Sequence, residues 1–426
     1  MQNTVDPNPL NGLVPKSPIA QLDASGIDKI LRSVRTHLGM DVAFVAEFRA
    51  HDRVFRHVDA EGQTLIKPGD ALPLERGFCQ RVVDGRLPQL IVDAQKLPEA
   101  ASLPETHAVP IGSHLSVPIR FSDGRIYGTF CCFSFMPDVS LTKRDLQMMK
   151  AFADVLADQI DRFTRQGRMQ ADLINRITKV MQQGQPGVVY QPIYDLETRR
   201  IAGVEGLSRF HAAPQRTPDL WFAEAAAVGL GPALESCAAK TVLAGLKSLP
   251  REVYVAVNSS PEFILSGAFA LLLQDVDISR VVLEITEHAS VSDYGSLLGT
   301  LAPLRALGLR IGVDDAGAGY ASMRHILSIE PNVLKLDMSL TRGIEQDRKR
   351  RALASALIAF ARETQVSIVA EGVETAAELQ TLRELGVTHG QGYYLARPMQ
   401  LADLSFSMQL GEEFSQISPD RRRFSA

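Results

Sequence analysis

The chain has 426 residues, a net charge of -4 at pH 7 and a hydrophobic fraction of 45%. This length is too great for one typical domain and suits two. The acidic balance offers no basic footprint, so we expect no nucleic-acid polymer as a partner. No stretch approaches the roughly 20 apolar residues that span a bilayer, and no signal peptide is recognisable. We therefore expect a cytoplasmic protein with no membrane partner.

Residues 1–20 contain four prolines and no apolar core, which predicts a disordered leader. The four cysteines are Cys79, Cys131, Cys132 and Cys237. Their spacing matches neither a zinc site nor a disulfide framework, and a reducing compartment fits this pattern. Cys131 and Cys132 lie in a strand-like run, so we interpret them as small core residues rather than as a redox or ligand-binding pair.

The pattern of residues 21–163 is typical of an α+β sheet domain. An amphipathic helix is predicted at 27–38, and strands are predicted at 41–48 and 53–58. The runs 113–121 and 126–135 are joined by Ser122-Asp123-Gly124, which predicts a hairpin. With the segment 73–91 before it, this half resembles a GAF domain. The resemblance implies a sensor for a small molecule whose identity stays open.

From Thr142 to Val180 apolar residues recur at helical spacing, so a helix is expected to connect the two halves across residues 164–187. A narrow apolar seam of this kind can pair with a second copy and form a homodimer. It can equally pack on its own domain, and the sequence leaves both alternatives open. Gly184-Gln185-Pro186-Gly187 ends the helix.

Short apolar strands alternate with helical segments over residues 188–404, which predicts an α/β (β/α)8 TIM-type barrel, and residues 405–426 are expected to form a tail. In such barrels the functional side chains stand where strands end. Polar residues fall at these places in successive strands: Glu205, Arg209, Asn258, Glu284, Glu287, Asp314, Asp315, Lys335, Asp337, Glu371, Glu374 and Gln391.

A ring of carboxylates in one barrel mouth repels itself and requires cations. The available ligands are oxygens without His or Cys, which selects Mg²⁺ or Mn²⁺. The neighbours Asp314 and Asp315 suit a carboxylate that bridges two ions about 3.5–4 Å apart. Lys335 can hold the attacking water, and Arg209 can pair with a phosphate oxygen. The residues alone therefore predict two-metal hydrolysis of a phosphodiester, without identifying the nucleotide.

The order of the motifs makes residues 188–404 resemble an EAL domain. These motifs are Tyr190-Gln191-Pro192, Glu205-Gly206-Leu207-Ser208-Arg209, Asn258, Glu284-Ile285-Thr286-Glu287, Asp314-Asp315, Lys335-Leu336-Asp337, Glu371-Gly372-Val373-Glu374 and Gln391-Gly392-Tyr393. The resemblance implies hydrolysis of cyclic di-GMP to linear pGpG with two divalent cations.

The resemblance also implies a role for each position. It assigns two overlapping sets of metal ligands: Glu205, Asn258, Glu284 and Asp314 for one ion, and Asp314, Asp315 and Glu371 for the other. It assigns catalytic roles to Lys335 at the water, Glu371 as a candidate general base, Glu287 bracing the loop 314–320, and Asp337 and Gln391 in the surrounding network. It places Gln191 and Arg209 against the substrate, with Glu374 in a supporting position.

Two positions depart from the EAL pattern. Gly206 stands where the family has alanine, and Ala316-Gly317-Ala318-Gly319 replaces Phe-Gly-Thr-Gly, so an aromatic anchor and a hydroxyl are absent. Neither change affects a metal-ligand position. The altered loop motivates an alternative, a catalytically inactive module that binds cyclic di-GMP or docks a protein. A metal-independent sensor adaptor, with its carboxylates on the solvated surface, is the third hypothesis.

Overall fold

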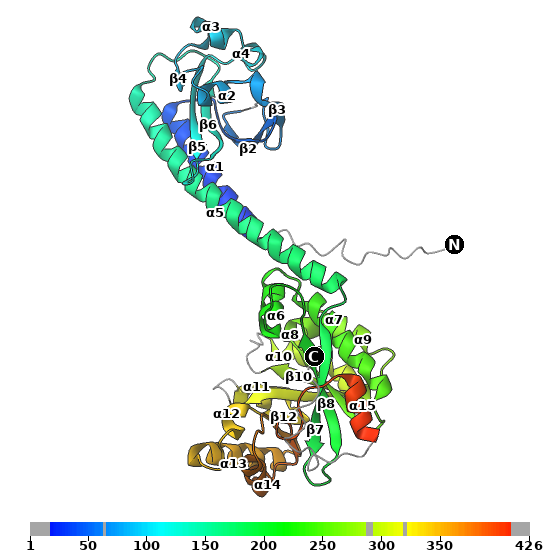
Figure 1. The fold of residues 1–426 in the computed structure, drawn as a ribbon. Helices are drawn as coiled ribbons and strands as arrows, with labels where there is room; N and C mark the ends of the chain where they lie inside the picture. The colour runs from blue at the N-terminus through cyan, green and yellow to red at the C-terminus, as the bar shows by residue number, and fades with distance from the viewer. Residues whose placement is uncertain (1–17, 63–64, 287–292, 318–321, 410–426) are drawn as a thin grey trace, which may run out of the picture. The chain divides into compact units, whose positions relative to one another are not determined.

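The computed structural model describes residues 18–62, 65–286, 293–317 and 322–409 (Figure 1). The chain divides into two compact units, Met1–Ala171 and Asp172–Ala426. Residues 1–17 of the predicted leader and 410–426 of the predicted tail lie outside the described residues. No helix in the described part of the chain is both long and apolar enough to cross a bilayer.

The first unit is an α+β domain built on an antiparallel sheet with the strand order β3-β2-β1-β6-β5-β4. Its helices and strands are α1 Pro18–Leu38, β1 Val42–Phe48, β2 Asp52–Ala60, β3 Ala71–Pro73, α2 Phe78–Val83, β4 Leu90–Ile91, α3 Pro98–Ala101, α4 Pro104–Ala108, β5 Ser113–Arg120 and β6 Ile126–Ser134. The predicted hairpin is confirmed, because β5 pairs antiparallel with β6 from Ser113↔Ser134 onward. Gly124 closes its turn with a φ of 85°, a conformation that favours glycine.

Each face of this sheet is covered by different helices (Figure 1). Strand side chains alternate between faces, so neighbouring residues enter different cores. Cys132 lies with residues of α1 and of α5, Lys143–Gln182, in one core. Cys131 lies with residues of α2 and the following short helices in the other. The prediction that both cysteines are buried core residues is confirmed.

The apolar seam of α5 packs largely on its own domain. Met149, Leu156 and Ile160 are buried in the core that α1 and the sheet complete. Nearer the helix end, Ile177 is fully buried against Trp221, the single tryptophan of the chain, in the second unit. The side chains that fill these cores are not available to a second copy of the chain.

The second unit is a closed eight-stranded barrel with the order β10-β11-β12-β13-β14-β7-β8-β9. Its elements are β7 Gly187–Asp195, β8 Ile201–Arg209, α6 Pro218–Ala227, α7 Gly231–Ala244, β9 Tyr254–Ser259, α8 Pro261–Leu265, α9 Ala268–Leu272, β10 Val281–Thr286, α10 Tyr294–Ala306, β11 Arg310–Ala316, α11 Ser322–Ile329, β12 Val333–Leu336, α12 Met338–Thr341, α13 Arg348–Glu363, β13 Ser367–Ala370, α14 Ala376–Leu385, β14 His389–Gly390 and α15 Leu401–Gln409. One strand differs from a regular (β/α)8 barrel, because β7 runs antiparallel to both β8 and β14.

Candidate active site

The strands of the barrel bring one layer of polar side chains into its interior. Below this layer lies an apolar cluster, whose buried members are Ile193, Tyr254, Ala256, Val282, Val333 and Val369. Asn258, Glu284 and Lys335 come two residues after members of this cluster, so strand alternation places them on the same interior face. Asn258 pairs in register with Glu284, and Asp314 pairs with the end of β10. Asn258, Glu284, Asp314 and Lys335 therefore meet at one end of the barrel.

The ammonium group of Lys335 lies at the centre of this layer and is fully buried. Its Nζ atom is 2.7 Å from Glu371 Oε1, 3.0 Å from Glu284 Oε2, and 3.2 Å from both Glu205 Oε2 and Asp314 Oδ1. Four carboxylates, contributed by β8, β10, β11 and the residue after β13, thus share one positive charge. If all four are ionised, negative charge is in excess, and further cations or protons must balance it.

The pKa values of these groups reflect that excess. Burial raises the pKa of Glu284 well above its usual range, and the neighbouring carboxylates add to a shift that Lys335 opposes. Burial likewise raises the pKa of Glu371 well above its usual range. Burial alone would lower the pKa of Lys335, but the surrounding carboxylates hold it well above its usual value. Divalent ions can replace the protons that this layer otherwise binds.

Amide side chains orient Glu205 within the layer. Asn258 Nδ2 donates to Glu205 Oε1 at 2.8 Å, and Gln391 Nε2 donates to Glu205 Oε2 at 2.7 Å. Gln391 also donates to Gln191 Oε1 at 3.1 Å. Burial raises the pKa of Glu205, yet Lys335 and these hydrogen bonds outweigh burial, so the net pKa is lowered. Glu205 is therefore held as a carboxylate whose direction is set by its amide neighbours.

Two sets of carboxylates have the spacing of cation ligands. The oxygens of each set lie within 4.8 Å of one another, and the sets are Glu205, Glu284 and Asp314, and Asp314, Asp315 and Glu371. Asp314 belongs to both sets, which fits a bridging carboxylate. Carboxylate oxygens are the ligands that Mg²⁺ and Mn²⁺ prefer. The donor atoms therefore fit two hard divalent cations, which would share their ligands with Lys335.

Backbone geometry explains how two consecutive aspartates can serve one site. Ordinary strand alternation would send the side chains of Asp314 and Asp315 to opposite faces. Asp315 has a φ of 57°, in the left-handed region that residues other than glycine rarely adopt. Its backbone N–H donates to Asp314 Oδ1 at 3.0 Å. This break in the strand brings both carboxylates within reach of Glu371.

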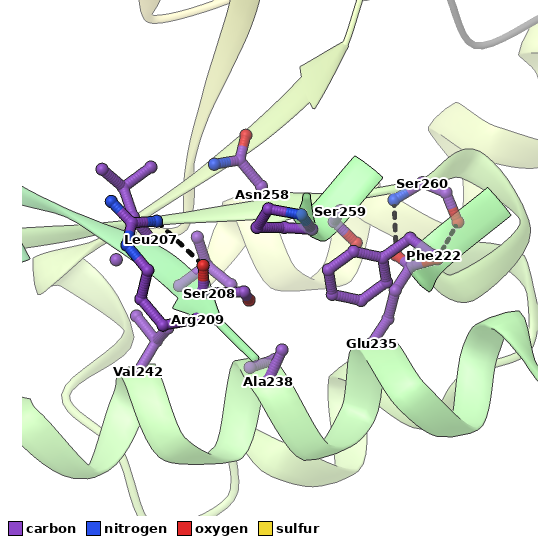
Figure 2. Close-up of a pocket in the computed structure, with 14 residues that line it drawn as sticks. Leu207, Ser208, Arg209, Phe222, Glu235, Ala238, Val242, Asn258, Ser259 and Ser260 are labelled. Atoms are coloured by element: carbon purple, nitrogen blue, oxygen red, sulfur yellow. Dashed lines mark hydrogen bonds between the residues drawn. The ribbon is translucent and has the colours of Figure 1, made fainter. Parts of the chain in front are cut away.

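A cavity of about 310 Å³ lies beside the polar layer (Figure 2). Arg209, Phe222 and Asn258 line it, as does Glu235, whose carboxylate accepts hydrogen bonds at 2.7 Å from both the backbone N–H and the hydroxyl of Ser260. Burial raises the pKa of Glu235. The guanidinium of Arg209 donates to the carbonyl of Ser208 at 2.9 Å.

A second cavity of about 280 Å³ exposes the polar layer itself. Gln191, Glu205, Glu371 and Gln391 line it. Leu207 lines both cavities, so the two adjoin at this residue. Together they form a space that extends on either side of the end of β8.

Sequence reasoning missed Phe222 and Glu235, which line the first cavity. Both lie on helices, α6 and α7, rather than at strand ends. A signal for Glu235 was present, since it is a carboxylate between Leu234 and Ala238 on the buried side of a helix. Burial of an acidic side chain on such a face is unusual without a partner.

Three predicted site residues lie elsewhere or beyond the described chain. Glu374 is exposed and forms an ion pair with Arg342, although it also lines the second cavity. Asp337 caps α12 by accepting a hydrogen bond at 2.8 Å from the backbone N–H of Ser339. Glu287 lies outside the described residues, as does most of the loop after Asp315.

The departure at Gly206 has a structural reason. A Cβ atom at this position would approach the methyl groups of Val242 to 2.4 and 2.5 Å, far inside van der Waals contact. Val242 on α7 therefore occupies the space that the alanine methyl of the family pattern would take. Because Val242 fills this space, glycine fits at position 206, and β8 pairs in register with β7 at both Glu205 and Gly206.

Two family models match the chain: an EAL domain at residues 174–398 and a GAF domain at residues 27–161. A cyclic di-GMP phosphodiesterase of Pseudomonas aeruginosa is 31% identical over 228 residues, which cover 50% of this chain and 38% of that protein. The bifunctional diguanylate cyclase/cyclic di-GMP phosphodiesterase MucR of the same organism is 31% identical over 252 residues, covering 56% and 37%.

Among solved structures, an EAL domain protein from Listeria monocytogenes has a TM-score of 0.51 at 23% identity, over 55% of this chain and 97% of that chain, and it supports the fold. The chain spans half or less of the length of the curated relatives it matches.

Proposed function

Because the chain belongs to the EAL domain family and carries a GAF domain ahead of its barrel, we propose that the barrel hydrolyses cyclic di-GMP to linear pGpG with two divalent cations. One observation carries the proposal: four carboxylates surround the buried ammonium of Lys335 where the barrel strands end. Such an acidic pocket suits a phosphodiester only when cations mediate the contact. The relatives named as cyclic di-GMP phosphodiesterases support the choice of nucleotide.

Mg²⁺ or Mn²⁺ would be held by the two overlapping ligand sets. One set would be Glu205, Glu284 and Asp314 with Asn258, and the other would be Asp314, Asp315 and Glu371. Ions of this class polarise a phosphoryl oxygen and lower the pKa of a coordinated water. The amide hydrogen bonds to Glu205 would keep one ligand in a fixed direction, which metal sites require of their supporting residues.

The protein's own groups divide the remaining work. Lys335 stays protonated, because its pKa lies well above the usual value, so it can donate a hydrogen bond to the attacking water. Glu371 has a raised pKa and lies 2.7 Å from Lys335, so it is our candidate to accept the proton of that water. Arg209 would pair with a phosphate oxygen through its planar guanidinium.

The two adjoining cavities suit the two halves of a cyclic dinucleotide. One half would occupy the cavity lined by Arg209, Phe222 and Glu235, and the other would occupy the cavity lined by Gln191 and Gln391. One of the two phosphodiesters that join these halves would then lie over the carboxylates. We also propose, from the family resemblance, that Asp337, Glu287 and Glu374 support this network.

The proposal is tested by incubating the purified full chain with cyclic di-GMP and Mg²⁺ or Mn²⁺ and measuring linear pGpG. A matched pair of variants is Glu371→Gln and Glu374→Gln. The first should lower turnover by about 100-fold or more, because general-base groups typically contribute that much. The second should change turnover by a few-fold at most. Absence of product at every metal concentration would reject the proposal.

The second candidate is a module that binds the nucleotide without turnover. Replacement of the family's loop residues by Ala316 and Ala318 favours it. It requires tight binding of cyclic di-GMP with no pGpG formed, and Glu371→Ala would then change affinity alone. Calorimetric binding measured alongside the hydrolysis assay separates the two candidates.

We propose further that the GAF domain regulates the barrel and that the chain works as a homodimer. Removal of residues 1–171 should change turnover if α5 transmits a signal from the first unit. Phe163 and Met169 of α5 are 40% and 68% exposed, so they are the seam residues left for a second copy. Light scattering should give the mass of a dimer for the wild-type chain and of a monomer for Met169→Lys. An equal mass for the two proteins would refute this contact.

A further inference from the structure

A charged group lies inside the core of the first unit. Arg53 of β2 is 2% exposed. Its Nη1 atom donates to Cys79 Sγ at 3.0 Å, and its Nη2 atom forms an ion pair with Glu105. A buried guanidinium costs several kcal/mol of solvation and is retained only with good partners. A thiol is an unusual partner for such a group unless it can become a thiolate.

A second thiol lies next to the first. Cys79 of α2 and Cys131 of β6 are both fully buried, and their Sγ atoms are 3.7 Å apart. The Sγ atom of Cys131 also contacts the hydroxyls of Ser116 at 3.1 Å and Thr129 at 3.3 Å. A disulfide has an S–S distance of about 2.05 Å, so closure requires the two sulfurs to approach by about 1.7 Å.

The two thiols differ in acidity, as a nucleophile and its partner should. The hydrogen bond from Cys131 lowers the pKa of Cys79, burial opposes it, and the charge of Arg53 lowers it further, to about 6. Burial raises the pKa of Cys131 well above its usual value, and its contact with Cys79 adds to the shift. Burial raises the pKa of Cys132, the next residue, as well, although the charge of Arg35 opposes this shift. The contacts with Cys131 and Arg53 together therefore distinguish Cys79 from its neighbours.

A small cavity adjoins this cluster at Arg53, whereas Cys79 and Cys131 lie behind its lining. It has a volume of about 30 Å³ and is lined by Arg53, Phe78, Glu105 and His114, among other residues. Arg53 Nε and His114 Nδ1 are buried, and neither has a hydrogen-bond partner among the described residues. The volume accommodates one or two molecules the size of water. A polar oxidant of that size fits, whereas an alkyl hydroperoxide does not.

We propose that Cys79 and Cys131 are a site of oxidation by hydrogen peroxide, which converts them to a disulfide within the GAF domain. The Cys79 thiolate attacks one peroxide oxygen, the O–O bond breaks, and Cys79 sulfenic acid and hydroxide form. The Cys131 sulfur then displaces the hydroxyl of the sulfenic acid to form the S–S bond. The displaced hydroxide takes the proton of the Cys131 thiol, and the hydroxide from the peroxide takes a proton from solvent, so two waters form. Two thiols are oxidised and one peroxide is reduced to two waters. This site goes beyond the proposed activity of the barrel and does not depend on it.

The test uses the full-length wild-type chain. The protein is treated with hydrogen peroxide at neutral pH, denatured, alkylated at its free thiols and digested with trypsin without reduction. Cys79 is then released in the peptide 77–81, and Cys131 and Cys132 are released together in the peptide 126–143. We expect these two peptides to be joined, to separate after treatment with a dithiol reductant, and to join at least about tenfold faster than Cys237 is oxidised.

Three comparisons sharpen the outcome. Cys132→Ser should leave the cross-link intact, whereas Cys131→Ser should abolish it and leave a sulfenic acid on Cys79 that a dimedone probe captures. Arg53→Met should slow the reaction at least about tenfold, because a buried thiol without a cation stays protonated. tert-Butyl hydroperoxide should react at least about tenfold more slowly than hydrogen peroxide with the wild-type chain, because the cavity excludes it.

The wild-type measurement stands without any variant, so a variant that fails to fold does not weaken the test. The proposal is overturned if both peptides remain fully alkylated while Cys237 is oxidised, or if the cross-link joins Cys79 to Cys132. Equal rates with the small and the bulky peroxide would overturn the role of the cavity.

Discussion

Lys335→Met removes the ammonium at the centre of the acidic layer while keeping a side chain of similar length. In metal-free protein the four carboxylates, at 2.7 to 3.2 Å from Nζ, lose their shared counter-charge. Removal of one partner from a buried ion pair typically costs about 3–5 kcal/mol. We expect the free energy of unfolding of the barrel to fall by about this amount. Protons taken up by Glu284 and Glu371, whose pKa values are raised, keep the loss from being larger.

Divalent cations should reverse most of this loss. A cation that binds only the folded barrel contributes about 2.7 kcal/mol to stability when its free concentration is about 100 times its Kd, and two sites contribute more. With Lys335 absent, the carboxylates have no competing ammonium, so the variant should gain more stability from Mn²⁺ than the wild type does. The turnover of Lys335→Met should remain about 100-fold below that of the wild type even with Mn²⁺, because the donor to the attacking water is gone.

Trp221 provides the assay. It is the single tryptophan of the chain and is fully buried in the barrel unit, so its fluorescence reports unfolding of the barrel without a tryptophan signal from the first unit. Urea titrations are run with chelator and with Mn²⁺, for the wild type, Lys335→Met and the control Lys240→Met, an exposed lysine of α7. The control should change stability by about 0.5 kcal/mol or less. An equal loss for Lys335→Met with and without Mn²⁺ would refute the cation-site reasoning.

Three further predictions concern other parts of the chain. Burial, and to a smaller extent the charge of Arg53, lowers the pKa of His114 to about 3. In the unfolded chain the imidazole titrates near 6.5, so the contribution of the neutral buried ring to stability is complete above pH 6.5 and is lost as the pH falls. The free energy of unfolding should fall by about 2 kcal/mol between about pH 7 and pH 5. Calorimetry of the wild type and of His114→Phe checks this, and an equal pH slope in both contradicts it. Gly206→Ala should destabilise the barrel by about 1–3 kcal/mol through overpacking against Val242. In urea titrations, the double variant with Val242→Ala should recover part of this loss. Losses that simply add in the double variant would argue against the clash. Glu374→Gln should cost less than about 1 kcal/mol, because its ion pair is exposed; a larger loss in the same titrations would show that Glu374 supports the site more closely than its contacts indicate.

Local patterns in the chain carried most of the fold. The alternation in 113–121 and 126–135 with a glycine turn between them predicts the β5–β6 hairpin, because both signals depend on neighbours a few residues apart. The alternation of strands and helices after Val188 predicts the barrel for the same reason. The antiparallel direction of β7 was not predictable in this way, because it is set by the strands that flank it in the closed sheet rather than by its own residues.

The site divides along the same line. Polar residues at successive strand ends indicate an oxygen-ligand site, and the structure brings Glu205, Glu284, Asp314 and Glu371 together around Lys335. The sequence did not distinguish these residues from Asp337, which occupies an equivalent strand-end position and caps a helix. Which strand-end carboxylate turns inward depends on register and on the backbone beyond the strand.

By itself, the sequence determined which chemistry the barrel mouth could hold, because residue type and strand period are properties of the chain. Only the tertiary structure decided which of these groups meet. The left-handed backbone at Asp315 brings two consecutive carboxylates into one site. The packing of α2 on β6 brings the sulfur of Cys79 to 3.7 Å from that of Cys131. Contacts between residues more than fifty positions apart arise from closure of the sheets and from helix packing, and no local pattern encodes them.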